Sequence, residues 1–394
     1  MTHTGTLDAD VIVVGLGSMG SMAAWRLAKR PGVRVIGIEQ FGLGHPHGGF
    51  SGESRLFRTA YHEGSGYVPM LLRARELWLE LGEAADRNLL LPIGALSIGT
   101  ADQASLLTVL DSVADHSLPH EVLSGREIAV RWPQHAVDDD HMGVLDLLGG
   151  AVRPEAAVLS AIEQAERHGA SISTGEQVIG IDPQGDGTVV VRTDSRTLRA
   201  TSVVVSAGAW SERLNPELKA RTEIYPLLLT WFLPRLESSF DPGNFPAFIR
   251  DEPGVHFFGA PSVDGYTVKV SPARMLPPVE SMDQMPTSVD PAVLSAVGRA
   301  AQRFFPGLYP EPVRYSVHPD AFTSDKVPVI DRSSDGTVVT LAGFSGHGFK
   351  FAPIIGEMAA DLALTGTSDL FDPSFALDAH HAIPTKLSRA REDA

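Results

Sequence analysis

The sequence contains no cysteine. This absence excludes disulfide bonds, thiolate catalysis, cysteine-ligated zinc and any thioether link to a cofactor. No run approaches the roughly 20 apolar residues of a membrane span, and the start lacks a basic segment followed by an apolar one, so no signal peptide is expected. Positive charge is also scarce. With 32 Lys and Arg against 48 Asp and Glu, the net charge of −16 argues against nucleic acid or an anionic membrane surface as a partner.

The remaining composition is that of an ordinary globular protein. Its 394 residues are enough for two domains with a large core, and 43% of them are apolar. We therefore expect a globular protein located in the cytoplasm. No metal site is predicted.

The most informative stretch lies near the N-terminus. An apolar run at residues 11–14 leads into Gly15-x-Gly17-x-x-Gly20 and an Ala-rich helical stretch, and a second apolar run ends at Glu39. Gly15 suits the tight turn, Gly17 lets the backbone approach a pyrophosphate, and Gly20 permits close packing of helix and strand. Glu39 can accept hydrogen bonds from ribose hydroxyls. The order of these features predicts a βαβ unit that binds NAD or FAD, against the alternative of an α/β turn without a ligand.

The rest of the chain predicts an α/β fold (α+β overall) built on this unit, which is a discontinuous Rossmann-type domain. Apolar periodicity predicts helices at about 67–81, 101–116, 155–168, 291–305 and 353–364, and one that starts at Ser124. Strands are expected at 93–98, 177–182, 187–192, 224–233, 255–258, 266–270, 327–330 and 337–341, and an apolar run from 202 that ends at Gly208 should rejoin the first layer. We assign residues 1–83, 150–216 and 319–394 to the dinucleotide domain. Residues 84–149 and 217–318 form a substrate domain with a mostly antiparallel sheet.

Several polar side chains are candidates for a site, and each has a plainer interpretation. Arg55 and Arg58 are three residues apart, which predicts one side of a helical turn; alone, they read as surface cations or partners of Glu53. Lys269 lies between two valines of a strand, so by pattern alone it faces solvent. Lys350, by contrast, sits in a glycine-rich turn between two phenylalanines, an unusual place for a solvated lysine.

Two further residues are interpreted as structural. His347 could act as a base, but a histidine that bonds the backbone of its turn is the preferred interpretation. Trp78 falls on the apolar side of the helix predicted at 67–81 and is assigned to the core.

Four segments together resemble the monomeric sarcosine oxidase and N-methyltryptophan oxidase family of FAD-dependent amine oxidases. They are the N-terminal βαβ unit, the Gly-Glu-Ser-Arg-x-x-Arg-x-Ala-Tyr stretch at 52–61, Val-Val-Ser-Ala-Gly-Ala-Trp at 204–210 and Gly-Phe-Ser-Gly-His-Gly-Phe-Lys-Phe at 343–351. The likeness covers nearly the whole chain in the same order, and the last motif is the most specific.

The resemblance implies FAD as cofactor and oxidation of the carbon next to the nitrogen of a secondary amine, with hydride transfer to flavin N5, imine hydrolysis and reduction of O2 to H2O2. It assigns the substrate carboxylate to Arg58 and Lys350, places Arg55 near the flavin ring and gives Lys269 the role of activating oxygen. The family also implies a monomer, with a dimer as the alternative.

The N-terminal motif and the resemblance together give the expected FAD contacts. They are Gly15, Gly17, Ser18, Met19, Gly20, Glu39, Gln40, Ser54, Arg55, Val178, Ala207, Gly208, Trp210, Gly343, Gly346, His347, Gly348, Phe349 and Lys350.

The departures from the family bear on the flavin link and on the substrate. Where relatives with a covalent flavin carry a cysteine, this chain has Asp320, so a non-covalent flavin is expected unless a histidine serves instead. Phe258 replaces a tyrosine beside the small substrate, Ala273 replaces a histidine after the oxygen lysine, and Ser51 replaces one near the flavin. These changes predict a wider, more apolar pocket for a larger or cyclic N-substituted amino acid.

The sequence leaves two alternatives to an oxidase open. One is an FAD-dependent amino acid dehydrogenase of the same fold that passes electrons to another acceptor. The other is a flavin-binding subunit whose own site is inactive.

Overall fold

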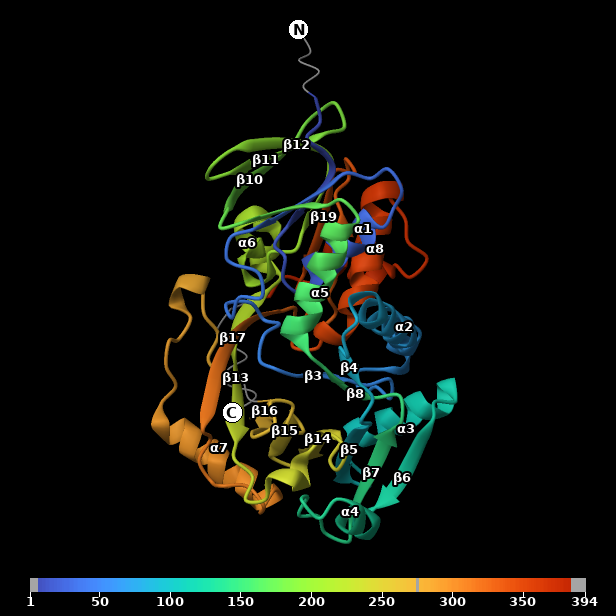
Figure 1. Cartoon of the computed structure of the whole chain (residues 1–394), viewed down its shortest axis with the longest axis vertical. Helices are drawn as coiled ribbons and strands as arrows, with labels where there is room; N and C mark the ends of the chain where they lie inside the picture. Colours follow the sequence, from blue (N-terminus) through green and yellow to red (C-terminus); the bar gives the residue numbers. More distant parts are fainter. Residues whose placement is uncertain (1–5, 274–275, 384–394) are drawn as a thin grey trace.

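The computed structural model describes residues 6–273 and 276–383. Two eight-stranded sheets and one three-stranded sheet make up its β structure, with the first large sheet in the upper part of Figure 1 and the second in the lower part. This confirms the predicted mixed α/β architecture, whereas the residue limits of the two domains stay a prediction. No helix within the described ranges is long and apolar enough to cross a membrane.

The first sheet contains the N-terminal βαβ unit and is parallel at its centre. Strand β1 (Ala9–Val14) lies between β2 (Val35–Glu39) and β12 (Thr197–Val205), and β12 also pairs in parallel with β19 (Val338–Ala342). The apolar run that ends before Gly208 therefore rejoins the first layer, as predicted. The other strands of this sheet are β9 (Ser171–Thr174), β10 (Val178–Pro183), β11 (Val189–Thr193) and β18 (Val329–Arg332).

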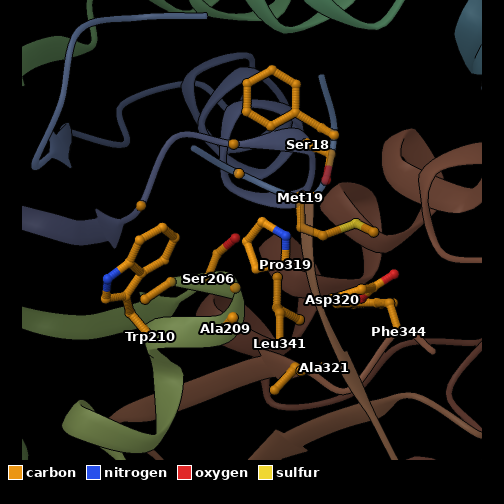
Figure 2. A pocket seen from close by; sticks show the side chains of 18 of the residues that line it. Ser18, Met19, Ser206, Ala209, Trp210, Pro319, Asp320, Ala321, Leu341 and Phe344 are labelled. Atoms are coloured by element: carbon orange, nitrogen blue, oxygen red, sulfur yellow. The ribbon is translucent and has the colours of Figure 1, made fainter. Parts of the chain in front are cut away.

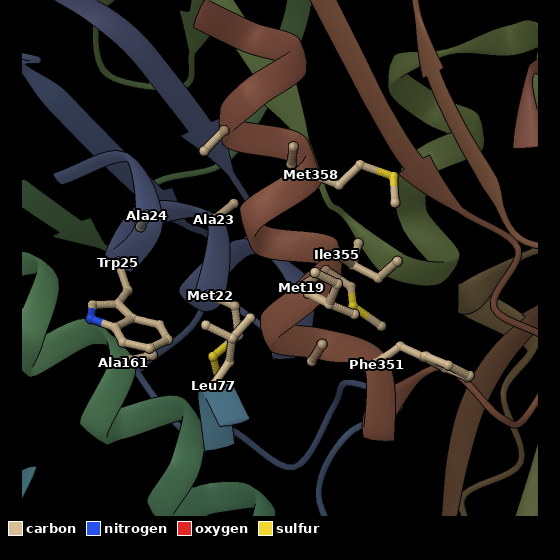
Figure 3. Packing of buried hydrophobic residues seen from close by; sticks show 14 of the residues in the cluster. Met19, Met22, Ala23, Ala24, Trp25, Leu77, Ala161, Phe351, Ile355 and Met358 are labelled. Atoms are coloured by element: carbon tan, nitrogen blue, oxygen red, sulfur yellow. The ribbon is translucent and has the colours of Figure 1, made fainter. Parts of the chain in front are cut away.

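Four helices share the core beside this sheet: α1 (Ser18–Ala28), α2 (Val68–Ala85), α5 (Pro154–Arg167) and α8 (Ala352–Thr365). Figure 3 shows Met22 of α1, Leu77 of α2 and Ile355 of α8 in this cluster. A Cβ on Gly356 would come within 2.5 Å of the carbonyl carbon of Met22, so α1 and α8 approach closely at a glycine. Trp78 is fully buried in the same cluster, which confirms its assignment to the core.

The second sheet has the strand order β17-β13-β16-β15-β14-β5-β7-β6, and only the β14–β5 pair is parallel. The prediction of a mostly antiparallel sheet is thus confirmed. Its strands are β5 (Ala95–Thr100), β6 (His120–Ser124), β7 (His141–Asp146), β13 (Glu223–Phe232), β14 (Ala247–Glu252), β15 (Val255–Ala260), β16 (Val268–Pro272) and β17 (Arg314–Phe322). The helices of this region are α3 (Ala104–His116), α4 (Gly125–Arg131) and α7 (Pro291–Phe304).

A three-stranded sheet joins the two regions and corrects one prediction. It consists of β3 (Arg55–Phe57), β8 (Gly150–Val152) and β4 (Leu90–Leu91). A short helix, α6 (Ser211–Leu214), comes after β12 in the chain. The helical turn predicted for Arg55 and Arg58 is wrong, because Arg55 pairs with Val152 in an extended strand. Arg58 follows the end of β3, and the two arginines have different partners, because Arg55 donates to the carbonyl oxygen of Gly49 and Arg58 donates to Glu63.

His135 is a buried histidine in the core of the second region. Its ring centroid lies 5.0 Å from that of Phe245, 5.5 Å from that of Phe248 and 5.0 Å from that of Phe305. Neither ring nitrogen has a hydrogen-bond partner in the described structure. A polar group in this position opposes folding, because it loses its bonds to water and gains none.

We expect the substitution His135→Phe to stabilise the protein by about 1–3 kcal/mol near neutral pH, the cost of an unsatisfied buried polar group. Burial lowers the pKa of His135 well below its ordinary value of 6.5. Below pH 6.5 the unfolded chain binds a proton at His135 that the folded chain does not bind, which destabilises the wild type. The stability gained by the substitution should therefore grow by about 1.4 kcal/mol for each unit that the pH falls below 6.5. Urea unfolding at about pH 7.5 and about pH 5.5 measures both effects. A variant that is no more stable at either pH would contradict the expectation.

Candidate functional site

A cavity of about 210 Å³ lies at the carboxyl ends of the parallel strands of the first sheet. Its lining includes Val14 at the end of β1, Glu39 at the end of β2 and Ser206 just after β12. Figure 2 shows side chains from three distant segments around it: the start of α1 with Ser18 and Met19, the turn from Ser206 to Trp210, and the C-terminal segments with Asp320 and Phe344. Ligands of parallel α/β sheets bind at this edge.

The glycine turn has the geometry that a dinucleotide requires. Gly15 has a φ of +84°, and a Cβ there would lie 2.5 Å from the carbonyl oxygen of Ser206. A Cβ on Gly20 would lie 1.8 Å from the carbonyl oxygen of Gly15. Gly17 caps α1 without a side chain, which leaves the first N–H groups of the helix free for an anion beside Ser18 and Met19. These residues therefore fit the pyrophosphate of FAD.

Glu39 faces the same cavity and is held by the backbone. Its carboxylate accepts hydrogen bonds from the N–H groups of Leu16 at 2.8 Å and Phe41 at 3.0 Å, and His45 Nε2 lies 3.4 Å away. Burial alone would raise the pKa of Glu39, but the hydrogen bonds from His45, Leu16 and Phe41 outweigh it and lower that pKa below its ordinary value. A carboxylate that stays ionised keeps lone pairs for ribose hydroxyls.

We expect Gly20→Ala to weaken FAD binding at least tenfold, because the added methyl forces α1 away from the glycine turn and overpacking of this kind costs about 1–3 kcal/mol. The matched control is Gly42→Ala, where a Cβ meets no atom within 4 Å. FAD affinity is measured by flavin fluorescence, with circular dichroism to confirm folding. Equal affinity of the two variants for FAD would contradict the role given to Gly20.

Most of the predicted FAD contacts line the cavity. Those that do are Gly15, Gly17, Ser18, Met19, Glu39, Gln40, Arg55, Val178, Ala207, Gly208, Trp210, Gly343, Gly346, Gly348 and Phe349. Gly20, Ser54, His347 and Lys350 lie outside this lining. Sequence reasoning missed the apolar wall of Leu227, Leu229 and Phe344, because nothing in their local pattern separates a pocket wall from core.

Arg58 and Lys350 come together on one aromatic ring. The guanidinium carbon of Arg58 lies 5.1 Å and Nζ of Lys350 lies 5.0 Å from the ring centroid of Tyr61. Both cations are buried, with 5% and 6% of their surface exposed. Lys350 Nζ donates hydrogen bonds to the carbonyl oxygen of His347 at 2.7 Å and to the Tyr61 hydroxyl at 3.3 Å. Two cations on one buried ring are suited to binding an anion. We call this pair of side chains the cation pair.

A carboxylate of the chain itself, Glu63, already lies at the cation pair. Its oxygens are 3.4 Å from Arg58 Nη2. Burial would raise the pKa of Glu63, but Arg58, His62 and Lys350 outweigh it and lower the value to about 2. Burial in turn lowers the pKa of Lys350 to about 7, against the opposing effect of Glu63.

The suggested pairing of Arg58 with Glu53 is wrong, since Glu53 pairs with Arg314. Sequence reasoning also missed Glu63. It stands five residues after Arg58, but a glutamate between a histidine and a glycine gives no sign of burial.

His347 has both ring nitrogens engaged. Its Nδ1 lies 2.9 Å from the Tyr61 hydroxyl and its Nε2 lies 2.8 Å from the carbonyl oxygen of Lys326. Burial, reinforced by Lys350, lowers the pKa of His347 to about 4. His347 thus bonds the backbone, as the preferred interpretation holds, but its partner Lys326 lies outside the turn for which that bond was predicted.

Lys269 is not a solvent-facing residue, so the interpretation from its strand pattern is wrong. Only 1% of its surface is exposed, because the segment that contains Gly52 and Ser54 lies against this side chain. Its Nζ donates hydrogen bonds to the carbonyl oxygens of Ser54 at 2.7 Å and Gly52 at 3.2 Å, and lies 5.9 Å from the ring centroid of Phe258. Burial, and then the nearby Arg55, lower the pKa of Lys269 well below its ordinary value. Burial lowers the pKa of Arg55 as well, to about 10.

The four residues that depart from the family pattern lie in different environments. Phe258 lines the cavity, and so does Asp320, which accepts a hydrogen bond from Gly346 N at 2.8 Å and whose pKa burial raises to about 6. Ser51 is buried outside the lining, with its hydroxyl 3.2 Å from His318 Nδ1. Ala273 is exposed, and its N–H donates to the carbonyl oxygen of His256 at 2.9 Å. The structure therefore brings Phe258 and Asp320, but not Ser51 and Ala273, to the cavity wall.

Comparison with known proteins places the chain among flavoenzymes. The family model described as FAD dependent oxidoreductase matches residues 10–362. A monomeric sarcosine oxidase of Streptomyces avermitilis is 36% identical over 376 residues, which cover 92% of this chain and 97% of the relative. An N-methyl-L-tryptophan oxidase of Salmonella enteritidis PT4 is 32% identical, with coverage of 96% and 98%.

Two solved structures have the same fold. The open form of NikD, an unusual amino acid oxidase essential for nikkomycin biosynthesis, superposes with a TM-score of 0.82 at 25% identity and covers 94% of this chain and 98% of its own. L-proline dehydrogenase of P. horikoshii reaches the same TM-score of 0.82 at 21% identity, with coverage of 95% and 98%. The match over residues 10–362 includes the glycine turn, Glu39 and the cation pair. The chain thus belongs to the FAD-dependent oxidoreductase family, as a relative of the monomeric sarcosine and N-methyl-L-tryptophan oxidases.

Proposed function

We propose that this protein is an oxidase of N-substituted or cyclic amino acids that contain a secondary amine, with O2 as electron acceptor and H2O2 as product. The observation that carries the proposal is the convergence of Arg58 and Lys350 on the ring of Tyr61, close to the glycine-rich turn at 343–348 that lines the FAD cavity. A buried cation pair beside a flavin site is suited to an amino acid carboxylate. A simple amine has no carboxylate for this cation pair to bind.

Bound FAD supplies the redox chemistry, by accepting a hydride equivalent from the C–H next to the amine nitrogen. Arg58 and Lys350 bind the substrate carboxylate in place of Glu63, which fixes the orientation of the reacting carbon. The same cations favour the neutral amine over the ammonium form. Phe258 forms part of an apolar wall that keeps water away from this position.

Lys269 is the residue that we propose for oxygen reduction. Its ammonium is held by two backbone carbonyls near Phe258 and away from bulk water. A fixed cation in a site of low dielectric stabilises the negative charge that O2 acquires as it is reduced.

The side chains that line the cavity indicate the class of substrate. Phe258, Leu227 and Leu229 line the cavity with carbon atoms alone, which suits a bulky or cyclic substituent better than a single methyl group. The FAD contacts, the substrate contacts and the residue limits of the two domains are parts of the same proposal. The monomeric state and the cytoplasmic location remain predictions.

A panel of amines tests the proposal. The purified holoprotein is mixed anaerobically with N-methyl, cyclic and glycated amino acids, bleaching of the flavin absorbance is recorded, and peroxide release is then measured in air. Bleaching followed by peroxide is the expected result. If none of the panel bleached the flavin, the inactive-subunit alternative would hold, and if sarcosine had the highest kcat/KM, the proposal of a wide pocket would be wrong.

A further inference from the structure

A second, much smaller cavity lies beside the cation pair. Its volume is about 10 Å³, which is close to the lower limit for one water molecule. The polar residues that line it are His62, Ser97, Ser105, Asp251 and His256. They come from the inner side of β5, β14 and β15, from the start of α3 and from the segment after Arg58.

This small cavity lies on the same face of the second sheet as the wall of the FAD cavity. His256 and Phe258 are two residues apart on β15, so their side chains point to the same side. Phe258 lines the large cavity and His256 the small one. The N–H of Ala273, the residue predicted from the family to lie at the substrate, also donates to the carbonyl oxygen of His256.

His256 and Asp251 form a dyad across the β14–β15 pair. Nδ1 of His256 lies 3.3 Å from Oδ1 of Asp251, and the Ser105 hydroxyl donates to Oδ2 of the same carboxylate. Burial would raise the pKa of Asp251, but His256 and Ser105 outweigh it and lower the value to about 2. An ionised aspartate accepts the Nδ1–H of the imidazole and leaves Nε2 as a basic nitrogen. The ring of His256 is about one-third exposed, so a proton taken up there can pass to solvent.

His62 connects this dyad to the cation pair. Its ring centroid lies 6.5 Å from that of His256, edge to face, while its Nδ1 contacts the Arg58 guanidinium and its Nε2 lies 3.2 Å from Glu63. With both nitrogens engaged, and with burial and Arg58 holding its pKa at about 3, His62 cannot take up a proton itself. His347 is engaged at both nitrogens too. Of these three histidines, His256 alone has a ring nitrogen without a partner in the described part of the chain.

We propose that the His256–Asp251 dyad takes the proton from the ammonium group of a bound amino acid, so that the enzyme accepts the zwitterion that predominates at neutral pH. The inference rests on the proposed oxidation of a secondary amino acid. The N–H bond of the ammonium breaks, the nitrogen keeps the electron pair, and the proton goes to Nε2 of His256 and then to solvent. No electrons change hands in this step.

Charged side chains lie around both the dyad and His62. Asp251 faces His256 from β14, and Arg58, Glu63 and Lys350 all lie close enough to His62 to influence its pKa. In the free protein Glu63 is the counter-ion of Arg58. A substrate carboxylate that binds in place of Glu63 takes over as the counter-ion of Arg58.

The experiment is the pH dependence of anaerobic flavin reduction by the fastest amino acid of the panel, in the holoprotein and in His256→Gln. Without the dyad only the amine that is already neutral in solution reacts. For an amine with a pKa of about 10, the reduction rate constant divided by Kd should then fall about tenfold per pH unit below that pKa, a loss of about 1000-fold at pH 7 that disappears near pH 10. In Asp251→Asn the same ratio should fall with the same dependence on pH, but by a smaller factor. The matched control is His120→Gln, because His120 is an exposed histidine.

Each outcome decides a different question. A wild-type flavin that no amine reduces contradicts the proposed function and leaves no substrate for the dyad. If the wild type reacts and His256→Gln has a parallel pH profile, the dyad is not the proton acceptor. If His256 had only a structural role, its replacement would slow flavin reduction equally at every pH, and added imidazole would not restore the rate. Restoration of the reduction rate of His256→Ala by added imidazole supports the proposal. If His256→Gln does not retain FAD, the pH profile of Asp251→Asn decides in its place.

Discussion

Replacing Lys269 with methionine is expected to slow reoxidation of the reduced flavin by O2 about 10²- to 10³-fold, which is the effect of removing one group that stabilises a developing anion. Flavin reduction by the amino acid should stay within about twofold, because Lys269 lies apart from the cation pair, with its Nζ bonded to Gly52 and Ser54. Methionine keeps the length and the apolar part of the side chain. Rapid mixing of reduced enzyme with O2, and of oxidised enzyme with substrate, measures the two half-reactions separately.

The exposed residue Lys219 gives the matched control, Lys219→Met, which should change neither half-reaction. Unchanged reoxidation in Lys269→Met would contradict the oxidase proposal and favour a dehydrogenase that uses another electron acceptor. Equal losses in both half-reactions would mean that Lys269 has only a structural role. In the wild type, the burial that lowers the pKa of Lys269 predicts that reoxidation slows as pH rises, at values below the 10.5 of an exposed lysine.

Replacing Arg58 with methionine is expected to lower kcat/KM for amino acid substrates about 10- to 150-fold. The change removes a charge-assisted hydrogen bond to the substrate carboxylate, worth about 1.5–3 kcal/mol, and leaves the half-buried carboxylate of Glu63 without its arginine. An amine that lacks the carboxylate should lose little by comparison. Steady-state kinetics with a matched pair, an N-methyl amino acid and its decarboxylated analogue, measures the difference.

The double variant Arg58→Met/Glu63→Gln controls for the unpaired charge. It removes both partners of the ion pair, so it should fold and retain FAD while keeping the loss toward the carboxylated substrate. If the two substrates lost activity equally in both variants, Arg58 would not be a carboxylate ligand.

The parts of the fold that the sequence predicted are those with a local signal. The βαβ unit from Gly15 to Glu39 follows from an apolar run, a glycine spacing and an acid, and the structure places all of them at one edge of the first sheet. Helix α4 begins where Ser124 predicts it, because the Ser124 hydroxyl accepts from Glu127 N and the Glu127 carboxylate accepts from Ser124 N. Such signals depend on residues that are close together in the chain, so the sequence alone is enough to predict the structure they form.

The errors concern residues whose environment is made by distant segments. The spacing of Arg55 and Arg58 predicts a helical turn, but pairing of Arg55 with Val152, almost a hundred residues away, makes the segment a strand. Strand alternation predicts a solvent-facing Lys269, but alternation only separates the two sides of a strand and does not say which of them is covered. Glu63 and His256 carried no signal at all, although they contact the cation pair and Asp251.

The sequence by itself therefore determined a βαβ unit with the pattern of a dinucleotide site at Gly15, Gly17, Gly20 and Glu39, because those residue types act on the backbone of their own segment. Its likeness to a family then identified the dinucleotide as FAD. Only the tertiary structure decided how the charges are arranged. Burial and the partner of each ionisable side chain depend on contacts between residues far apart in the chain, and these contacts bring Glu63 to Arg58, leave Lys269 among backbone carbonyls and pair His256 with Asp251.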